Sequence, residues 1–195
     1  MKIIKANWAD KEIVVSILRE SFAQDPQINY IVGEGGNKEK RFKRLMSYGF
    51  EQAIVNGKVE LTEDKKAVAI WRNHHSNKMT IRLLIENIRF LIDFGFNRLA
   101  TISKMEKTIG ANYPKDDSFY YLWFIGTLPQ MQGKGYASKL LNSWLEKAQK
   151  ERVEVYLETS TESNLAYYQK KGFELYDKIM LEGENPLLVY LMKKG

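Results

Sequence analysis

An apolar segment, a glycine-rich loop and an amphipathic helix follow one another between residues 119 and 157. Residues 119–128 are aromatic and branched with no clear polar side, which predicts a strand covered on both faces. Pro129 breaks this strand, a glycine loop occupies residues 132–137, and apolar residues then recur at helical spacing. Residues 153–157 form the next strand. The order strand, helix, strand defines a βαβ unit, so we expect the two strands to be parallel.

The remaining segments predict a mixed α/β architecture in one domain that spans residues 1–195, because 195 residues suffice for one sizeable core. Two helices are expected before the first hairpin: one capped by Asn7 and ended at Asp25-Pro26, the other carrying Phe42 to Ile54 and closed at Asn56-Gly57. The other expected elements are strands at residues 2–6, 59–61, 67–71, 173–181 and 187–192 and a short helix at 163–171.

Composition narrows the class of protein. The chain has no Cys, so disulfides, thiolate metal sites and a cysteine nucleophile are excluded, and a reducing cytoplasm suits it. The net charge of +6 favours an anionic ligand, but Lys and Arg are interspersed with acids and form no basic block, so we expect no nucleic-acid partner. No run approaches the roughly 18 apolar residues that span a bilayer, and we expect no membrane association.

A helical insertion at about residues 73–117 separates the first hairpin from the βαβ unit. Within 81–96 the charged residues Arg82, Glu86, Arg89 and Asp93 form one narrow stripe, and nearly everything else is apolar. We therefore expect this helix to be buried on most sides, by the domain's own core, over a ligand cleft, or against a second subunit. The chain is accordingly a monomer or a homodimer. A second helical piece is expected at 98–109.

The loop at residues 132–137 has the features of a phosphate-binding turn, because free backbone N–H groups and the positive end of a helix point to one place. A P-loop is excluded, since Leu128 stands where its first glycine belongs and Gly135 follows Lys134 where Ser or Thr is required. The dinucleotide fingerprint also fails, because Ser138 stands in place of its third glycine.

Two motifs resemble those of the GCN5-related N-acetyltransferases (GNAT). The first, Gln132-Gly133-Lys134-Gly135-Tyr136-Ala137, agrees with the family's Gln/Arg-x-x-Gly-x-Gly/Ala motif. The second consists of the strand end at 157–160, then Asn164, then a Tyr-x-x-x-Gly-Phe sequence at 168–173. The resemblance covers about residues 119–175. It implies the family's acyltransferase fold, a twisted mixed sheet of six or seven strands with helices on both faces.

The resemblance also implies that the chain binds acetyl-coenzyme A as a cosubstrate and needs no metal. Three groups of residues would contact the coenzyme. The pyrophosphate would lie on Gln132, Gly133, Lys134, Gly135, Tyr136 and Ala137, the pantetheine on the main chain near Ile125, Gly126 and Thr127, and the remaining contacts would come from Asn164 and Tyr168. Asn164 and Tyr168 are four residues apart and therefore share one helix face.

Tyr168 holds the position of the family's general acid, and a phenol can protonate a thiolate leaving group. The general base is open between Glu158, at the end of a parallel strand, one residue of the pair His74 and His75, and a water chain with no dedicated side chain. The expected activity is transfer of an acetyl group to a primary amine of a small molecule or peptide. A noncatalytic coenzyme-binding regulatory module is the alternative.

Overall fold

A computed structural model describes residues 1–72, 76, 78–115, 119–182 and 185–195. The strands are β1 (Ile3–Lys5), β2 (Gly57–Thr62), β3 (Ala67–Arg72), β4 (Phe119–Thr127), β5 (Glu154–Thr159), β6 (Glu174–Leu181) and β7 (Leu187–Lys194). The helices are α1 (Lys11–Ser21), α2 (Pro26–Val32), α3 (Lys38–Asn56), α4 (Ile81–Gly110), α5 (Tyr136–Glu151) and α6 (Glu162–Lys170), with short 3-10 turns at Trp8–Asp10 and Pro129–Met131.

The strands form one sheet in the order β1-β2-β3-β4-β5-β7-β6. β4 and β5 are paired in parallel, as the βαβ pattern predicts, and the other neighbouring pairs are antiparallel. The predicted α/β class with a mixed sheet is therefore confirmed.

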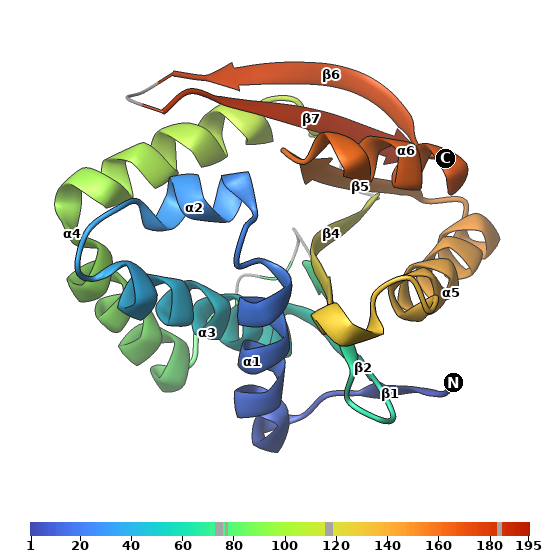
Figure 1. The fold of residues 1–195 in the computed structure, drawn as a ribbon, viewed down its shortest axis with the longest axis horizontal. Helices are drawn as coiled ribbons and strands as arrows, with labels where there is room; N and C mark the ends of the chain where they lie inside the picture. Colours follow the sequence, from blue (N-terminus) through green and yellow to red (C-terminus); the bar gives the residue numbers. More distant parts are fainter. Residues whose placement is uncertain (73–75, 77, 116–118, 183–184) are drawn as a thin grey trace.

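Helices cover both faces of the sheet (Figure 1). The alternation along β3 shows why, because Val68 and Ile70 join the core beneath α1 and α3, whereas Ala67, Ala69 and Trp71 join the core beneath α5. Both sides of this strand are buried, so the hydrophobic effect fixes its place in the middle of the sheet.

The predicted end of the first helix at Asp25-Pro26 is wrong, because α1 ends at Ser21 and this dipeptide begins the additional helix α2. The Asp25 side chain accepts a hydrogen bond from the Ile28 N–H at 2.9 Å, and Pro26 occupies the first helical position. Aspartate as cap and proline at the first position are a helix start signal. α2 brings Asp25 and Gln27 toward the carboxyl ends of β4 and β5.

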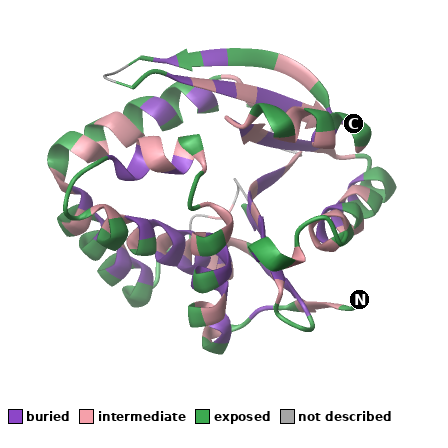
Figure 2. Cartoon of the chain, viewed as in Figure 1, coloured by how far each residue is buried: buried purple, intermediate pink, exposed green. Residues whose placement is uncertain are grey.

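The insertion folds into α4, which is broken at Gly95 (φ 70°, ψ 166°) into the two predicted pieces. Within the single chain, the apolar residues of the first piece are not buried on most sides, as the chain's own core or a ligand cleft would require. Leu83, Phe90 and Phe94 are buried, but most other large apolar residues of the first piece are exposed (Figure 2). The carboxylates of the polar stripe are buried instead, against α3.

Candidate active site

β4 and β5 diverge toward their carboxyl ends. Their parallel pairing covers only Phe119 to Tyr121 opposite Glu154 to Tyr156, whereas β4 continues to Thr127 and β5 to Thr159. A cavity of about 800 Å³ opens here and is lined from both strands and from α2 and α4. Ligands of open α/β sheets bind at such carboxyl ends, so this cavity is the candidate active site.

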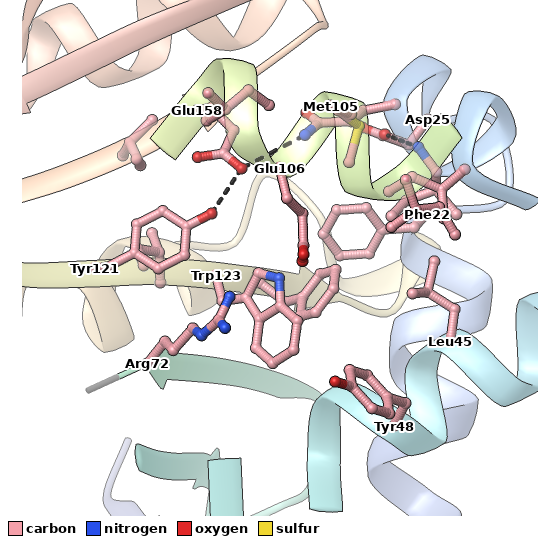
Figure 3. Close-up of a pocket in the computed structure, with 18 of the residues that line it drawn as sticks. Phe22, Asp25, Leu45, Tyr48, Arg72, Met105, Glu106, Tyr121, Trp123 and Glu158 are labelled. Carbon is pink, nitrogen blue, oxygen red and sulfur yellow. Dashed lines mark hydrogen bonds between the residues drawn. The ribbon is translucent and has the colours of Figure 1, made fainter. Parts of the chain in front are cut away.

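A β-bulge places an additional aromatic residue in this cavity. Ile70 pairs with Phe124 and the adjacent Trp71 pairs with Leu122, so Trp123 is the extra residue on β4. A bulge redirects side chains that strict alternation would separate. Trp123 and Phe124 therefore both pack toward the core of α1–α4, and Trp123 lies in the middle of the cavity, between Glu158 and Tyr48 (Figure 3).

Glu158, a predicted candidate for the base, lies at one end of the cavity and is held by three neutral donors. The Tyr121 hydroxyl donates to its Oε1 at 2.6 Å, the Gln27 amide donates to the same oxygen at 3.5 Å, and the Tyr113 hydroxyl donates to Oε2 (Figure 3). No salt bridge to Glu158 occurs among the residues that the structure describes.

The environment of Glu158 makes its carboxylate more basic than usual. Burial raises the pKa of Glu158 and outweighs the hydrogen bonds from Tyr113, Tyr121 and Gln27 and the charge of Arg72, which lower it. Burial together with the Glu158 charge also holds the pKa of Tyr113 and Tyr121 well above the usual phenol value, so both phenols stay protonated donors. A partly buried carboxylate with a raised pKa and solvent access through a cavity suits a proton acceptor.

Asn164 and Tyr168 line the same cavity from α6, as their four-residue spacing predicts. The Asn164 amide donates to the Thr159 hydroxyl at 3.3 Å, which ties α6 to the end of β5. Tyr168 is 7% exposed, and burial, with the nearby Tyr167 and Asp25, raises the pKa of its hydroxyl. This phenol therefore carries its proton at neutral pH.

The glycine loop adopts the backbone conformation that its sequence indicates. Gly133 (φ 74°) and Gly135 (φ 82°) are left-handed, and open space surrounds the position where a Cβ would lie on either. Gly135 is the N-cap residue of α5 and has no side chain that could accept a hydrogen bond from the first turn of the helix. In the part of the chain that the structure describes, the N–H groups of residues 133–137 donate to no other group. These free donors and the positive end of α5 form a cradle that fits a phosphate group.

Three other predicted coenzyme residues have different surroundings. Ile125 lines the cavity. Gly126 packs on α1, because a Cβ there would lie 2.8 Å from the Ser21 hydroxyl, and that hydroxyl donates to the Thr127 carbonyl at 2.9 Å. The Thr127 side-chain oxygen is buried and has no hydrogen-bond partner.

Side chains elsewhere in the loop point outward. The Tyr136 hydroxyl donates to Asp64 at 2.7 Å, and the Lys134 ammonium lies 3.7 Å from the Met131 sulfur. Gln132 begins the loop as the C-cap of the Pro129–Met131 turn, and Ala137 lies in the first turn of α5. The candidate bases His74 and His75 lie outside the described residues.

The sequence does not indicate the partners of Glu158. Tyr113 follows α4 and Tyr121 lies on β4, and no local pattern distinguishes these phenols from core aromatics. The Asp25-Pro26 start signal of α2 could have predicted the helix that carries Gln27. Trp123 could not have been predicted, since a bulge depends on the neighbouring strand.

Comparison with known proteins relates this fold to the GNAT acetyltransferases. Residues 90–173 match the family model described as Acetyltransferase (GNAT) family. An uncharacterized N-acetyltransferase of Schizosaccharomyces pombe is 26% identical, with 90% of this chain and 75% of that protein aligned. The family match, this relative and the fold support assignment to the GNAT family.

Solved structures of low sequence identity share this fold. The crystal structure of "histone acetyltransferase HPA2 and related acetyltransferase" from Corynebacterium glutamicum has a TM-score of 0.67 at 21% identity, covering 99% of this chain and 94% of that one. Arylalkylamine N-acetyltransferase 2 of Aedes aegypti has a TM-score of 0.66 at 16% identity, covering 99% and 97%.

Proposed function

We propose that this chain transfers the acetyl group of acetyl-coenzyme A to a primary amine. The observation that carries the proposal is the Glu158 carboxylate, partly buried and held by neutral donors in a cavity that opens between two diverging parallel strands. The free N–H groups at the start of α5 follow directly from the end of β4 and supply a phosphate cradle at the same edge of the sheet.

The coenzyme residues are proposed with the cradle as their centre. The loop from Gln132 to Ala137 would hold the pyrophosphate, and the edge of β4 near Ile125, with no partner strand beyond Tyr121 on the β5 side, would hold the pantetheine. Asn164 and Tyr168 would contact the coenzyme from α6. When bound, acetyl-coenzyme A supplies an acetyl group activated as a thioester.

Two side chains would move protons. A primary amine is an ammonium ion at neutral pH and must lose a proton before its nitrogen can form the new C–N bond. Glu158 accepts that proton. As the C–S bond breaks, Tyr168 would donate its hydroxyl proton to the sulfur. The nitrogen would lose its second proton to solvent as the amide forms, and Tyr168 would regain a proton from solvent.

The cavity also indicates the class of acceptor. Phe22, Tyr48, Phe90 and Trp123 line the cavity. Glu106 and Arg72 lie near Trp123 (Figure 3). Aromatic rings bind apolar bodies and attract cations through their faces, whereas the partly buried carboxylates of Asp25 and Glu158 disfavour an acceptor carboxylate. We infer that the acceptor amine is attached to an apolar or aromatic group and carries no adjacent carboxylate.

The test is thiol release from acetyl-coenzyme A with a panel of amines, together with calorimetry of coenzyme binding. The panel contains phenethylamine, tryptamine, hexylamine, phenylalanine, spermidine and a tetrapeptide. We expect turnover, with kcat/KM highest for the first two amines. Binding without turnover on any amine indicates the noncatalytic module, and absence of binding contradicts both functions.

Gly135→Asp is the matched variant for the coenzyme site. A side chain at φ 82° is strained, and its carboxylate would lie against the pyrophosphate, so we expect coenzyme binding to be lost. Gly36→Asp, at an exposed glycine with open space, no positive φ and no place in the cavity lining, is the control and should bind normally. Normal binding by Gly135→Asp would contradict the proposed cradle.

A further inference from the structure

The first piece of α4 exposes an unusual amount of apolar surface. Among the residues that the structure describes, ten large apolar side chains are exposed, and eight of them lie between residues 79 and 96 (Figure 2). These are Met79, Ile81, Leu84, Ile85, Ile88, Leu91, Ile92 and Phe96, with exposed fractions from 43% to 84%. We name this set the α4 face.

The α4 face is continuous along one side of the helix. At 100° per residue, its six members from Ile81 to Ile92 fall within an arc of about 120° that contains no charged residue. The opposite side carries Leu83, Phe90 and Phe94, which are buried in the protein core. The helix is thus apolar toward the protein and apolar toward its outer surface.

The charged residues of α4 are drawn away from the α4 face. Glu86 and Asp93 bind Arg44 of α3, and both carboxylates have side chains less than 5% exposed. Arg82 lies over the Trp8 ring at 4.1 Å and 3.7 Å from the Glu51 carboxylate. The exposed apolar patches of typical monomers measure a few hundred Å². A larger apolar patch that no charged side chain covers marks an interaction site.

The apolar residues of the α4 face have the sequence spacing that is found where two helices pack along each other. Ile81, Leu84, Ile88 and Leu91 occupy successive a, d, a and d positions of a heptad repeat. The eight side chains expose on the order of 1,000 Å², against roughly 800 Å² per partner in an interface of standard size.

We propose that the α4 face binds the α4 face of a second copy of this chain. A two-fold interface uses the same patch twice, and Ile88 lies near the middle of the run, so an antiparallel pair about Ile88 would place Leu84 opposite Ile92. A lipid surface fits less well, because membrane-binding helices extend basic side chains beside the apolar face. Here Arg82 and Arg89 turn back toward Glu51 and Glu86.

This pairing has a consequence for the candidate active site. Asn87, Phe90 and Leu91 of the same helix line the cavity, so the second copy would support the wall that faces the acceptor. The pairing itself does not depend on the proposed function, since it rests on the outer side of α4 alone.

Disulfide trapping tests the proposal directly, because the chain contains no Cys. Ile88→Cys should give a covalent dimer on mild oxidation, since a residue at a two-fold axis lies beside its own copy. Met180→Cys, on β6 and 58% exposed, is the control and should form no covalent dimer on the same oxidation. A covalent dimer of both variants, or of neither, overturns the proposed pairing.

Sedimentation of the unmodified chain gives a second readout at about 1–100 µM. We expect a dimer, and a monomer with unchanged circular dichroism for Ile88→Glu/Ile92→Glu, because both residues are exposed in the single chain. A monomeric wild type, or a double variant that stays dimeric, contradicts the proposal. A monomer that binds vesicles of mixed neutral and anionic lipid would instead identify a membrane surface.

Discussion

Two groups of carboxylates lie partly or wholly out of contact with solvent in this molecule, and their partners differ in charge. Glu86 and Asp93 of α4 share one guanidinium: Arg44 donates to the two Glu86 oxygens at 2.9 and 3.0 Å and to Asp93 at 2.6 Å, and Lys40 lies 2.7 Å from Asp93. Glu158 of β5 has phenol and amide donors instead.

The charge of the partner decides what each carboxylate can do. Burial acts to raise the pKa of Asp93, but the hydrogen bonds and charges of Lys40 and Arg44 prevail and lower it. That carboxylate stays ionised and joins α3 to α4. Burial prevails at Glu158, whose pKa is raised. The carboxylates with cationic partners are therefore structural, whereas Glu158, whose hydrogen-bond donors are neutral, suits proton transfer.

Glu158→Gln should have the largest effect on activity. Glutamine keeps the size of the side chain but cannot accept the amine proton, so we expect turnover at pH 7 to fall about 1,000-fold while coenzyme affinity is retained. Thiol release and calorimetry measure the two quantities. Unchanged turnover would mean that a water chain or another residue removes the proton.

Arg44→Met should mainly lower stability. Removing the cation leaves Glu86 and Asp93 buried without their partner, which costs about 3 kcal/mol of unfolding free energy. Urea unfolding checks this value, and kcat per folded molecule should stay near the wild-type value. Restoration of stability by Glu86→Gln in the same chain is the control, whereas an unaffected urea midpoint speaks against a structural role.

Tyr168→Phe should lower turnover about 100-fold with coenzyme affinity nearly unchanged, because only the donated proton is lost. Tyr167→Phe is the matched control: its hydroxyl lies 3.2 Å from Ser138 Oγ on α5, and it should have near wild-type turnover. Equal turnover in the two variants would remove Tyr168 from the mechanism.

The two carboxylate groups should give stability slopes of opposite sign with pH. The folded pKa of Glu158 lies above the unfolded value of 4.5, so the wild type loses stability relative to Glu158→Gln as pH rises from 4.5 through the folded value. The folded pKa of Asp93 lies below 3.8, so the wild type loses its advantage over Asp93→Asn as pH falls through that folded value. Each slope amounts to at most about 1.4 kcal/mol per pH unit. Urea midpoints measured across this range check both signs.

The parts of the fold that depend on local sequence could be predicted. The apolar run, the left-handed glycines and the helix spacing of Asn164 and Tyr168 are each specified by neighbouring residues, so the parallel pair and the residues of the cradle follow from the sequence. Glu158 could be proposed from its place at the end of a parallel strand.

The rest depends on tertiary contacts. The periodicity of α4 locates its polar stripe but does not say what the stripe faces. The stripe faces inward because Glu86 pairs with Arg44, which lies 42 residues away in the sequence. The phenols around Glu158 come from 45 and 37 residues away. No window of a single helix or strand contains both members of these pairs.

The pH dependence of kcat at saturating acetyl-coenzyme A and amine tests the central claim most directly. If Glu158 is the proton acceptor, wild-type kcat rises with pH as one group with a pKa above 4.5 loses its proton, and Glu158→Gln shows a low profile without this rise. The same rise at the same height in Glu158→Gln would contradict the account.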